Sequence, residues 1–227
     1  MFISKSNKKN DWKKITGRLL FISLLLSIIF IIFKIVNTPP ISSEVEYTKV
    51  RSDYVLMLLQ CILGIIVMAI PSAIEKKFSI EIPNKMEVMY FIFLYCAIYL
   101  GEVRNFYYLI PYWDVILHAF SGAMLGALGF SLVSYLNEME FLDMNLSPFF
   151  VALFAFCFAL ASGAVWEIYE FLADGLLGTN MQKFILVDGV VLIGREALVD
   201  TMTDLIVDAL SSLVITIIGY YSIKKNN

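Results

Sequence analysis

Six long apolar segments constrain the fold of this chain most strongly. They run over residues 18–36, 54–74, 86–101, 112–136, 148–173 and 198–223, and the third is the shortest. A helix needs roughly 20 residues to cross a hydrocarbon core of about 30 Å. Lipid offers the backbone no hydrogen-bond partners, so only helices and closed barrels span a membrane, and continuous apolar runs favour helices. The pattern predicts an all-α, polytopic transmembrane helix bundle with about six spans.

The composition supports a membrane protein. Of the 227 residues, 59% are hydrophobic, and the mean hydropathy is +0.79, whereas a soluble domain is about half apolar. We expect one transmembrane domain over residues 18–223, a basic segment over 1–17 and a short tail over 224–227, in a cell membrane (inner or plasma membrane) that the chain crosses several times. The run 18–36 is long for the apolar core of a secretory signal and lacks a small-residue cleavage site, so we interpret it as a retained first helix.

Basic residues indicate how the helices are oriented, because cytoplasmic segments carry an excess of lysine and arginine. The side of the N-terminus carries eleven: Lys5, Lys8, Lys9, Lys13, Lys14, Arg18, Lys76, Lys77, Lys85, Lys224 and Lys225. The opposite side carries five: Lys49, Arg51, Arg104, Lys183 and Arg195. The excess predicts that both termini are cytoplasmic. The longest connection, residues 174–197, is then outside, and we expect residues 184–191 to form a short hairpin or a re-entrant segment.

Ionisable residues within or at the edges of three apolar segments point to a site. Charge inside a bilayer is expensive, so such residues usually face one another, water or an ion. Residues three or four apart share one face of a helix. Three such stripes occur here: Asp114 with His118, Glu167 with Glu170 and Asp174, and Asp200 with Asp204 and Asp208. Small residues nearby, in Gly122-x-x-x-Gly126 and Ser162-Gly163-Ala164, favour close helix packing.

The predicted orientation brings the three stripes to one side of the membrane. Segments 112–136 and 198–223 start outside, and segment 148–173 ends outside. With a rise of about 1.5 Å per residue, Asp208 lies roughly 12 Å deeper than Asp200, and Glu167 roughly 10 Å from Asp174. We therefore expect one polar site in the outer half of the membrane.

One imidazole combined with several carboxylates is a ligand set for a divalent cation such as Mg, Mn, Fe or Zn. The candidate metal ligands are His118, Glu167, Glu170, Asp204, Asp200 and Asp114. Two further carboxylates, Asp174 and Asp208, are candidates for a catalytic role such as general base. The Glu-x-x-His motif of di-iron bundles is absent, and the chain has one histidine, which argues against a conventional di-iron site. We expect no other cofactor.

Structural explanations remain open for these residues. Those near helix ends are also suited to the membrane interface (Asp114, Asp174 and Asp200). Those further inside are also suited to ion pairs with arginine: Glu167, Asp204 and Asp208 with Arg104 or Arg195. A lone histidine is more often a core residue than a ligand. The convergence of three stripes favours the functional interpretation.

At these residues the chain resembles the YjdF-like family of uncharacterised bacterial inner-membrane proteins. The motifs lie within roughly residues 86–222: Asp114-x-x-x-His118 before a glycine-rich helix, Trp166-Glu167-Ile168-Tyr169-Glu170, Gly178-Thr179-Asn180-x-Gln182 and Asp200-Thr201-x-x-Asp204. In that family the Gly-Thr-Gln-like turn runs almost directly into the Asp-Thr segment, whereas residues 183–199 intervene here. The resemblance implies a polytopic membrane protein with an acidic site and no established activity.

Three classes of function fit the pattern. A divalent-metal-dependent membrane enzyme would hold the cation at this site and act on a lipid or lipid-linked substrate. An ion or proton-coupled transporter needs polar residues on both sides, and the inner halves of the last three segments offer only Ser, Thr and Tyr. A non-catalytic membrane subunit or sensor would use the site structurally. We favour the enzyme, with the lipid bilayer as its partner. We expect no nucleic-acid partner, because a basic run directly before an apolar segment is a topology signal.

Overall fold

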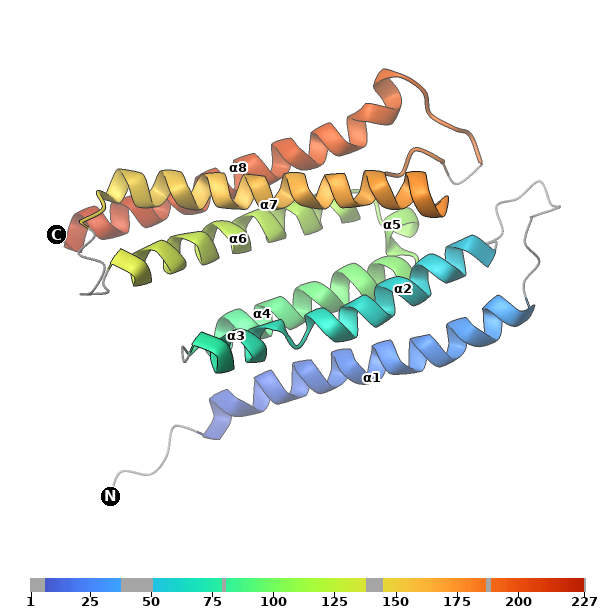
Figure 1. Ribbon diagram of the computed structural model, residues 1–227, viewed down its shortest axis with the longest axis horizontal. Helices are drawn as coiled ribbons and strands as arrows, with labels where there is room; N and C mark the ends of the chain where they lie inside the picture. The colour runs from blue at the N-terminus through green and yellow to red at the C-terminus, as the bar shows by residue number, and fades with distance from the viewer. Residues whose placement is uncertain (1–6, 38–50, 79–80, 138–144, 187–188, 227) are drawn as a thin grey trace. The chain divides into compact units, whose positions relative to one another are not determined.

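The helices of the chain follow its apolar segments (Figure 1). The computed structural model describes residues 7–37, 51–78, 81–137, 145–186 and 189–226. Its elements are α1 (Asn7–Asn37), α2 (Arg51–Val67), α3 (Ile70–Phe78), α4 (Asn84–Leu94), the π-helix η1 (Tyr95–Val103), α5 (Phe106–Leu109), α6 (Trp113–Asn137), α7 (Pro148–Leu177) and α8 (Arg195–Asn226). Residues 1–6 of the expected basic segment and residue 227 of the tail lie outside the described residues.

Six helices in the described part of the chain are long and apolar enough to cross a membrane. They cover Trp12–Asn37, Asp53–Lys77, Asn84–Val103, Trp113–Asn137, Pro148–Leu177 and Arg195–Lys225. The prediction of an all-α, polytopic membrane protein with six spans is therefore confirmed. The cytoplasmic location of both termini stays a prediction.

Contacts between residues divide the chain into two compact units, Met1–Pro111 and Tyr112–Asn227. Each unit contains three of the six candidate spans, and one transmembrane domain over residues 18–223 stays a prediction. All the candidate ligands belong to the second unit.

In the first unit, α1, α2 and α4 enclose an apolar core. Its buried side chains include Leu20, Leu24, Met57, Cys61 and Phe91. Near the start of α1, the Lys13 ammonium pairs with the buried carboxylate of Glu87 on α4. The ion pair compensates a charge that would otherwise be buried alone.

The predicted span 54–74 is not one continuous helix. α2 ends at Val67 and α3 begins at Ile70, because Pro71 has no N–H to donate to the carbonyl of Val67. The hydroxyl of Tyr90 donates to that carbonyl at 2.8 Å instead. A side chain of α4 thus satisfies the backbone group that proline leaves unpaired in apolar surroundings.

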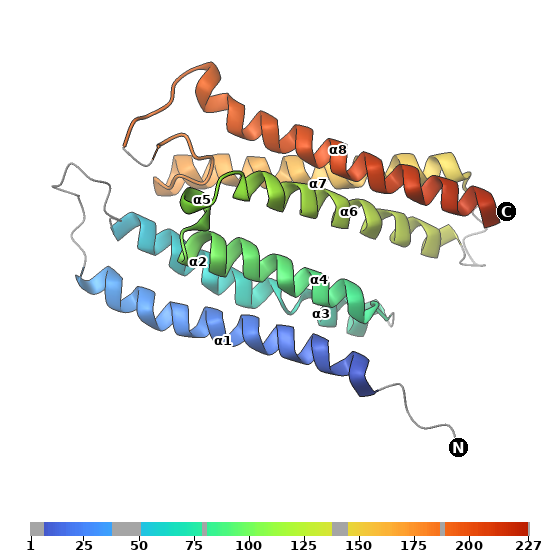
Figure 2. The ribbon, with the colours of Figure 1, turned by 180° about the vertical axis from the view of Figure 1, so that it is seen from behind.

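In the second unit, α6, α7 and α8 pack against one another along their lengths (Figures 1 and 2). One row of residues is buried on each helix: His118, Gly122, Gly126, Gly129 and Val133 on α6; Val151, Ala155, Ala159, Gly163, Glu167 and Glu170 on α7; Asp204, Asp208, Ser212 and Thr216 on α8. Spacings of three and four keep each row on one face. Small residues allow the helices to approach closely, and the ionisable residues gather at one end of the rows.

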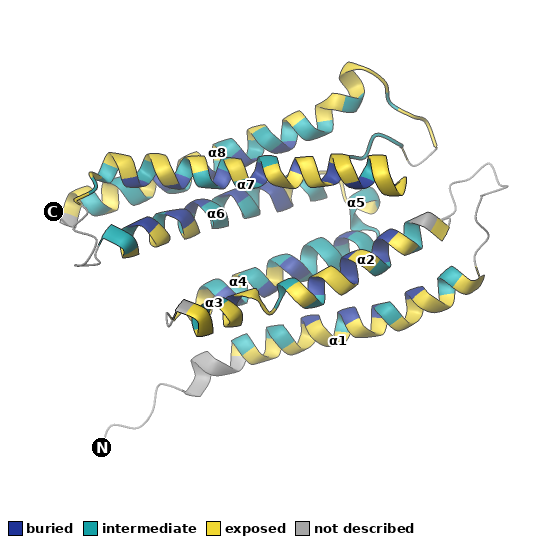
Figure 3. Ribbon diagram, viewed as in Figure 1, coloured by how far each residue is buried: buried dark blue, intermediate teal, exposed yellow. Residues whose placement is uncertain are grey.

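The outward faces of the helices are apolar. Large exposed side chains include Phe33, Ile66, Val165, Phe171 and Ile218, and Figure 3 shows the exposed residues, in yellow, along the length of the spans. Soluble monomers rarely expose contiguous apolar patches above a few hundred Å². The pattern of burial therefore agrees with helices that contact lipid.

Candidate metal centre

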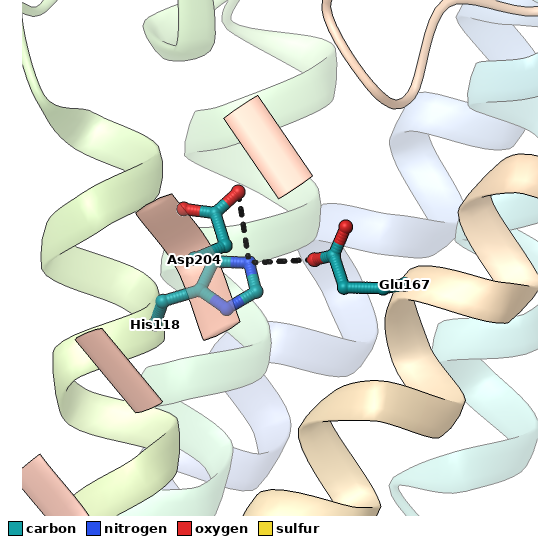
Figure 4. Close-up of side chains that lie close together, drawn as sticks. All are labelled: His118, Glu167 and Asp204. Atoms are coloured by element: carbon teal, nitrogen blue, oxygen red, sulfur yellow. Dashed lines mark ion pairs between the residues drawn. The ribbon is translucent and has the colours of Figure 1, made fainter. Parts of the chain in front are cut away.

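One side chain from each helix of the second unit meets at the centre of the site (Figure 4). The Nε2 atom of His118, on α6, lies 3.8 Å from Oε1 of Glu167 on α7 and 3.7 Å from Oδ2 of Asp204 on α8. All three side chains are buried, with 8%, 5% and 2% of their surface exposed. The sequence stripes therefore converge in three dimensions, and their ion-pairing partner is His118.

His118, Glu167 and Asp204 form a triad, and carboxylate oxygens of this triad lack hydrogen-bond partners among the described residues. Within the described part of the chain, both oxygens of Glu167 and Oδ2 of Asp204 are buried and accept no hydrogen bond. Burying a polar atom without a hydrogen bond costs free energy, and burying a charge without a compensating charge costs more. The arrangement favours a positive species between the carboxylates and the imidazole.

The geometry fits a divalent cation. Oxygen or nitrogen ligands at about 2.0–2.2 Å from a metal lie about 3–4 Å from one another. Potential ligand atoms of His118, Glu167 and Asp204 all lie within 4.8 Å of one another. Small side-chain adjustments would bring the three into coordination distance.

The second ring nitrogen of His118 is held by Asp208. Nδ1 lies 3.2 Å from Oδ2 of Asp208, and the hydroxyl of Ser121 donates to the other carboxylate oxygen at 3.3 Å. A metal-binding histidine typically donates its remaining N–H to such a carboxylate, which fixes the tautomer and the ring. This contact leaves Nε2 as the ligand atom, directed at Glu167 and Asp204.

Two glycines make room for this arrangement. A Cβ on Gly163 of α7 would collide with the carboxylate of Asp208. A Cβ on Gly122 of α6 would lie 2.9 Å from the Cα of Asp208, closer than real side chains approach. The small-residue motifs predict these glycines to be packing residues. Here their packing admits the carboxylate that orients the histidine.

A second group of acidic residues lies beside the triad. Carboxylate oxygens of Asp114, Asp200 and Asp204 also lie within 4.8 Å of one another. Asp114 is in the first turn of α6, where its Oδ1 lies 3.9 Å from Nε2 of His118. The two groups share Asp204.

The connection between α7 and α8 contacts all three helices of the unit. Asp174, near the end of α7, accepts hydrogen bonds from the Thr179 hydroxyl at 2.6 Å and from the backbone N–H groups of Met181 and Gln182 at 2.7 and 2.9 Å. The Gln182 amide donates to the Thr201 hydroxyl of α8 at 2.9 Å. The connection is therefore tied to the helix ends that carry the site.

An ion pair links the same connection to α6. The Lys183 ammonium lies 3.2 Å from Oδ2 of Asp114 and donates to the carbonyl of Met181 at 2.6 Å. Lys183 has a positive φ of 52°, which is uncommon for a residue other than glycine. These contacts place a positive charge at the edge of the acidic group.

Of the two forms expected for residues 184–191, a short hairpin or a re-entrant segment, the contacts between described residues agree with the hairpin. A bridge pairs Ile185 with Val191, and the N–H of Leu192 donates to the carbonyl of Phe184 at 2.8 Å. Residues 187–188 lie outside the described residues.

The structure separates the candidate residues by their contacts. Five of them form the two ligand groups: Asp114, His118, Glu167, Asp200 and Asp204. Glu170 is buried one turn from Glu167 and belongs to neither group found among the described residues. Asp174 anchors the connection and Asp208 holds the histidine. Catalytic roles for these two residues stay predictions.

Two residues that contribute to the site, Lys183 and Ser121, were not predicted from the sequence. Lys183 was counted only among the basic residues that indicate orientation, and Ser121 was not among the candidate site residues. The signal for Ser121 is its position three residues after His118, on the same helix face. The contact of Lys183 with Asp114 joins residues that are distant in sequence and has no comparable signal.

Comparisons with known proteins agree with this architecture. Residues 18–225 match the model of a family described as "Predicted membrane protein (DUF2238)". An uncharacterised protein of Thermotoga maritima is 30% identical over 151 residues, which cover 66% of this chain and 69% of the relative. No solved structure matches the chain.

Proposed function

This chain belongs to a family of predicted membrane proteins (DUF2238), and from that premise we propose that it is a divalent-metal-dependent membrane enzyme that acts on a lipid or lipid-linked substrate. The observation that carries the proposal is the triad of His118, Glu167 and Asp204. Oε1 of Glu167 and Oδ2 of Asp204 lie near one ring nitrogen, and both atoms are buried and accept no hydrogen bond from the described residues. Intramembrane ionisable residues mark functional sites by default.

The surroundings of the triad favour a lipid substrate. The same turns that carry Glu167 and Asp204 expose large apolar side chains on their outer faces, among them Ile168, Phe171, Met202 and Ile206. A membrane protein presents such faces to acyl chains. A lipid headgroup at the membrane surface would therefore be close to the site while its chains stay in hydrocarbon.

We assign different roles to the residues of the site according to their positions. Asp208 lies 3.2 Å from Nδ1 of His118, and we assign it the role of accepting the ring proton there, which leaves the lone pair of Nε2 directed to the centre. A bound cation would polarise a phosphoryl or carbonyl oxygen or activate water. Glu170, predicted from the sequence as a ligand, is buried one turn from Glu167 but lies outside the ligand groups of the described residues, and we assign it a role in proton transfer instead. Asp174 anchors the connection between α7 and α8.

The inner half of the unit argues against a transport path. Below Asp208 the buried row of α8 continues with Ser212 and Thr216, whose hydroxyls donate to carbonyls of their own helix at 3.1 and 3.0 Å. A Cβ on Gly126 would lie 3.3 Å from the Cα of Ser212, so α6 and α8 are in close contact there. A site closed on this side is suited to an enzyme or a sensor rather than a transporter.

The experiment is metal analysis of the full-length protein purified from membranes, followed by an assay in vesicles. We expect bound Mn, Fe, Zn or Mg in the wild type and a loss of at least about tenfold in affinity in His118→Ala, Glu167→Gln and Asp204→Asn. Glu196→Gln is the matched control, because Glu196 is an exposed acid one turn before Asp200 on α8. Wild-type protein that binds no divalent cation would overturn the proposal.

The vesicle assay distinguishes an enzyme from a sensor. Vesicles that contain a phosphatidyl phosphomonoester or a polyprenyl phosphate are incubated with the protein and Mn²⁺ or Mg²⁺, and the lipids are followed by mass spectrometry. We expect turnover that a chelator abolishes and that the triad variants lack. Tight cation binding without turnover on lipid phosphates or carboxylic ester lipids would favour the non-catalytic subunit or sensor.

A further inference from the structure

We propose that a second divalent cation binds beside the first, held by Asp114, Asp200 and Asp204, with the Asp204 carboxylate shared between the two positions. The inference rests on the proposed function, because it takes the triad of His118, Glu167 and Asp204 as the first position. Oxygen atoms of the three aspartates lie within 4.8 Å of one another, as do the ligand atoms of the triad. The site would be dinuclear.

The burial of Asp204 supports the second position independently of the clustering. Its side chain is 2% exposed, and its Oδ2 accepts no hydrogen bond within the described residues. Oδ2 of Asp200 is likewise buried and accepts no hydrogen bond from the described residues. A carboxylate has two oxygens with about four lone pairs, so Asp204 is able to serve two cations at once.

The charge of the site also favours more than one cation. Asp114, Glu167, Asp200 and Asp204 bring four carboxylates around a single imidazole. The Lys183 ammonium, 3.2 Å from Oδ2 of Asp114, compensates one of them at the outer edge. With one divalent cation at the triad and the Lys183 ammonium, one negative charge of the four carboxylates would stay uncompensated, and buried charges are normally paired or bind metals.

The two positions differ in the ligands they offer. The triad includes an imidazole, which suits Mn, Fe or Zn, whereas the second position is formed by carboxylate oxygens alone, which suit the hard cations Mg²⁺ and Mn²⁺. Two cations about 3.5–4 Å apart are the arrangement that clamps a phosphoryl group during displacement. A phosphate ester is therefore the substrate class that the site favours.

Mn²⁺ tests the proposal because it fits both positions and is paramagnetic. The full-length protein in lipid nanodiscs is titrated with Mn²⁺, bound ions are counted, and the low-temperature electron paramagnetic resonance spectrum is recorded. We expect two ions per chain with a spin-coupled spectrum in the wild type and in the Glu196→Gln control. Asp200→Asn should bind one ion with an uncoupled six-line spectrum, and Asp204→Asn should weaken both ions at least about tenfold.

The possible counts separate this inference from the proposed function. One ion per wild-type chain at saturation, or two coupled ions in Asp200→Asn, would overturn the second position and leave the triad intact. No bound ion in the wild type would refute the proposed function itself. Size-exclusion profiles report whether each variant is folded, and Asp114→Asn, at the other side of the second position, replaces Asp200→Asn if that variant aggregates.

Discussion

The orientation of one imidazole ring controls the candidate site at the scale of single residues. His118 is the only nitrogen ligand in either group of described residues, and its Nδ1 faces Asp208 at 3.2 Å. When Nδ1 carries the proton, Nε2 presents a lone pair to the centre. Asp208 is thus a positioning residue that acts through the histidine.

Replacing Asp208 by asparagine should weaken cation binding without removing a ligand. The new amide is able to donate to Nδ1, which moves the ring proton to Nε2 and blocks coordination. We expect Mn²⁺ affinity to fall about 10- to 100-fold. Titration with Mn²⁺ measures the change, and Ser121→Ala, which keeps the carboxylate, should have a smaller effect. Unchanged affinity in Asp208→Asn would mean that the contact does not set the tautomer.

A methyl group at Gly163 should disturb the same contact from the opposite side. The Cβ of Gly163→Ala would collide with the Asp208 carboxylate, and overpacking a core typically costs about 1–3 kcal/mol. We expect a lower melting temperature and weaker Mn²⁺ binding, measured by thermal unfolding and titration. Gly175→Ala is the control on the same helix: no atom lies within 4 Å of its Cβ, and an alanine within a helix stabilises it by about 0.5–1 kcal/mol. Equal effects of both changes would contradict the proposed fit.

The division of roles among the ionisable residues could be predicted only in part from the sequence. Helical spacing and the cost of intramembrane charge identified His118, Glu167 and Asp204, which the structure brings together. Spacing alone could not separate a ligand from a residue that orients one, because Asp204 and Asp208 are equivalent in a four-residue repeat. His118 on the neighbouring helix α6 distinguishes them, because Asp204 faces its Nε2 atom and Asp208 faces its Nδ1 atom.

At the scale of elements, three side-chain contacts hold the connection between α7 and α8 at the helix ends that carry the site. Asp174 binds it to α7, Lys183 to Asp114 on α6, and Gln182 to Thr201 on α8. Thr179, Gln182 and Thr201 belong to the motifs that carry the family resemblance. Their contacts give those motifs a structural explanation.

Removing the anchor of this connection should loosen it without removing a ligand. Asp174→Ala leaves the Thr179 hydroxyl and the N–H groups of Met181 and Gln182 without their acceptor. Each hydrogen bond to a charged group contributes about 1.5–3 kcal/mol. We expect amide hydrogen exchange over residues 178–186 to accelerate at least about tenfold, measured by mass spectrometry. The exposed Glu196→Ala at the start of α8 should leave the rate unchanged; unchanged exchange in Asp174→Ala would show that other contacts hold the connection.

The six spans could be predicted from the sequence, but the break in the second span, the π-helix η1 and the short helix α5 were not predicted. Apolar length identified six spans, which the helices confirm. The break between α2 and α3 was not predicted, although Pro71 lies there. A proline is tolerated within a membrane helix where neighbours satisfy the freed carbonyl, and the neighbour here, Tyr90 of α4, is distant in sequence.

At the scale of the whole molecule, burial shows one end of the second unit to be chemically distinct from the other. The buried rows change from small residues to ionisable ones along α6, α7 and α8. The side of the membrane that this end faces follows only from the count of basic residues. Lys183, one of the five predicted outer charges, contacts Asp114, so the site explains its position without reference to topology.

Cysteine labelling tests the orientation directly. In a chain with Cys61, Cys96 and Cys157 replaced by alanine, Gly175→Cys places a thiol at the site end of α7, where no atom lies within 4 Å of the Cβ. Lys224→Cys places one at the opposite end of α8. Because the excess of basic residues favours cytoplasmic termini, a membrane-impermeant maleimide should label the first variant in intact cells and the second only after permeabilisation. The reverse pattern would put the metal centre at the cytoplasmic face and change the expected substrate to a lipid of the inner leaflet, while the contacts within the site would stand unaltered.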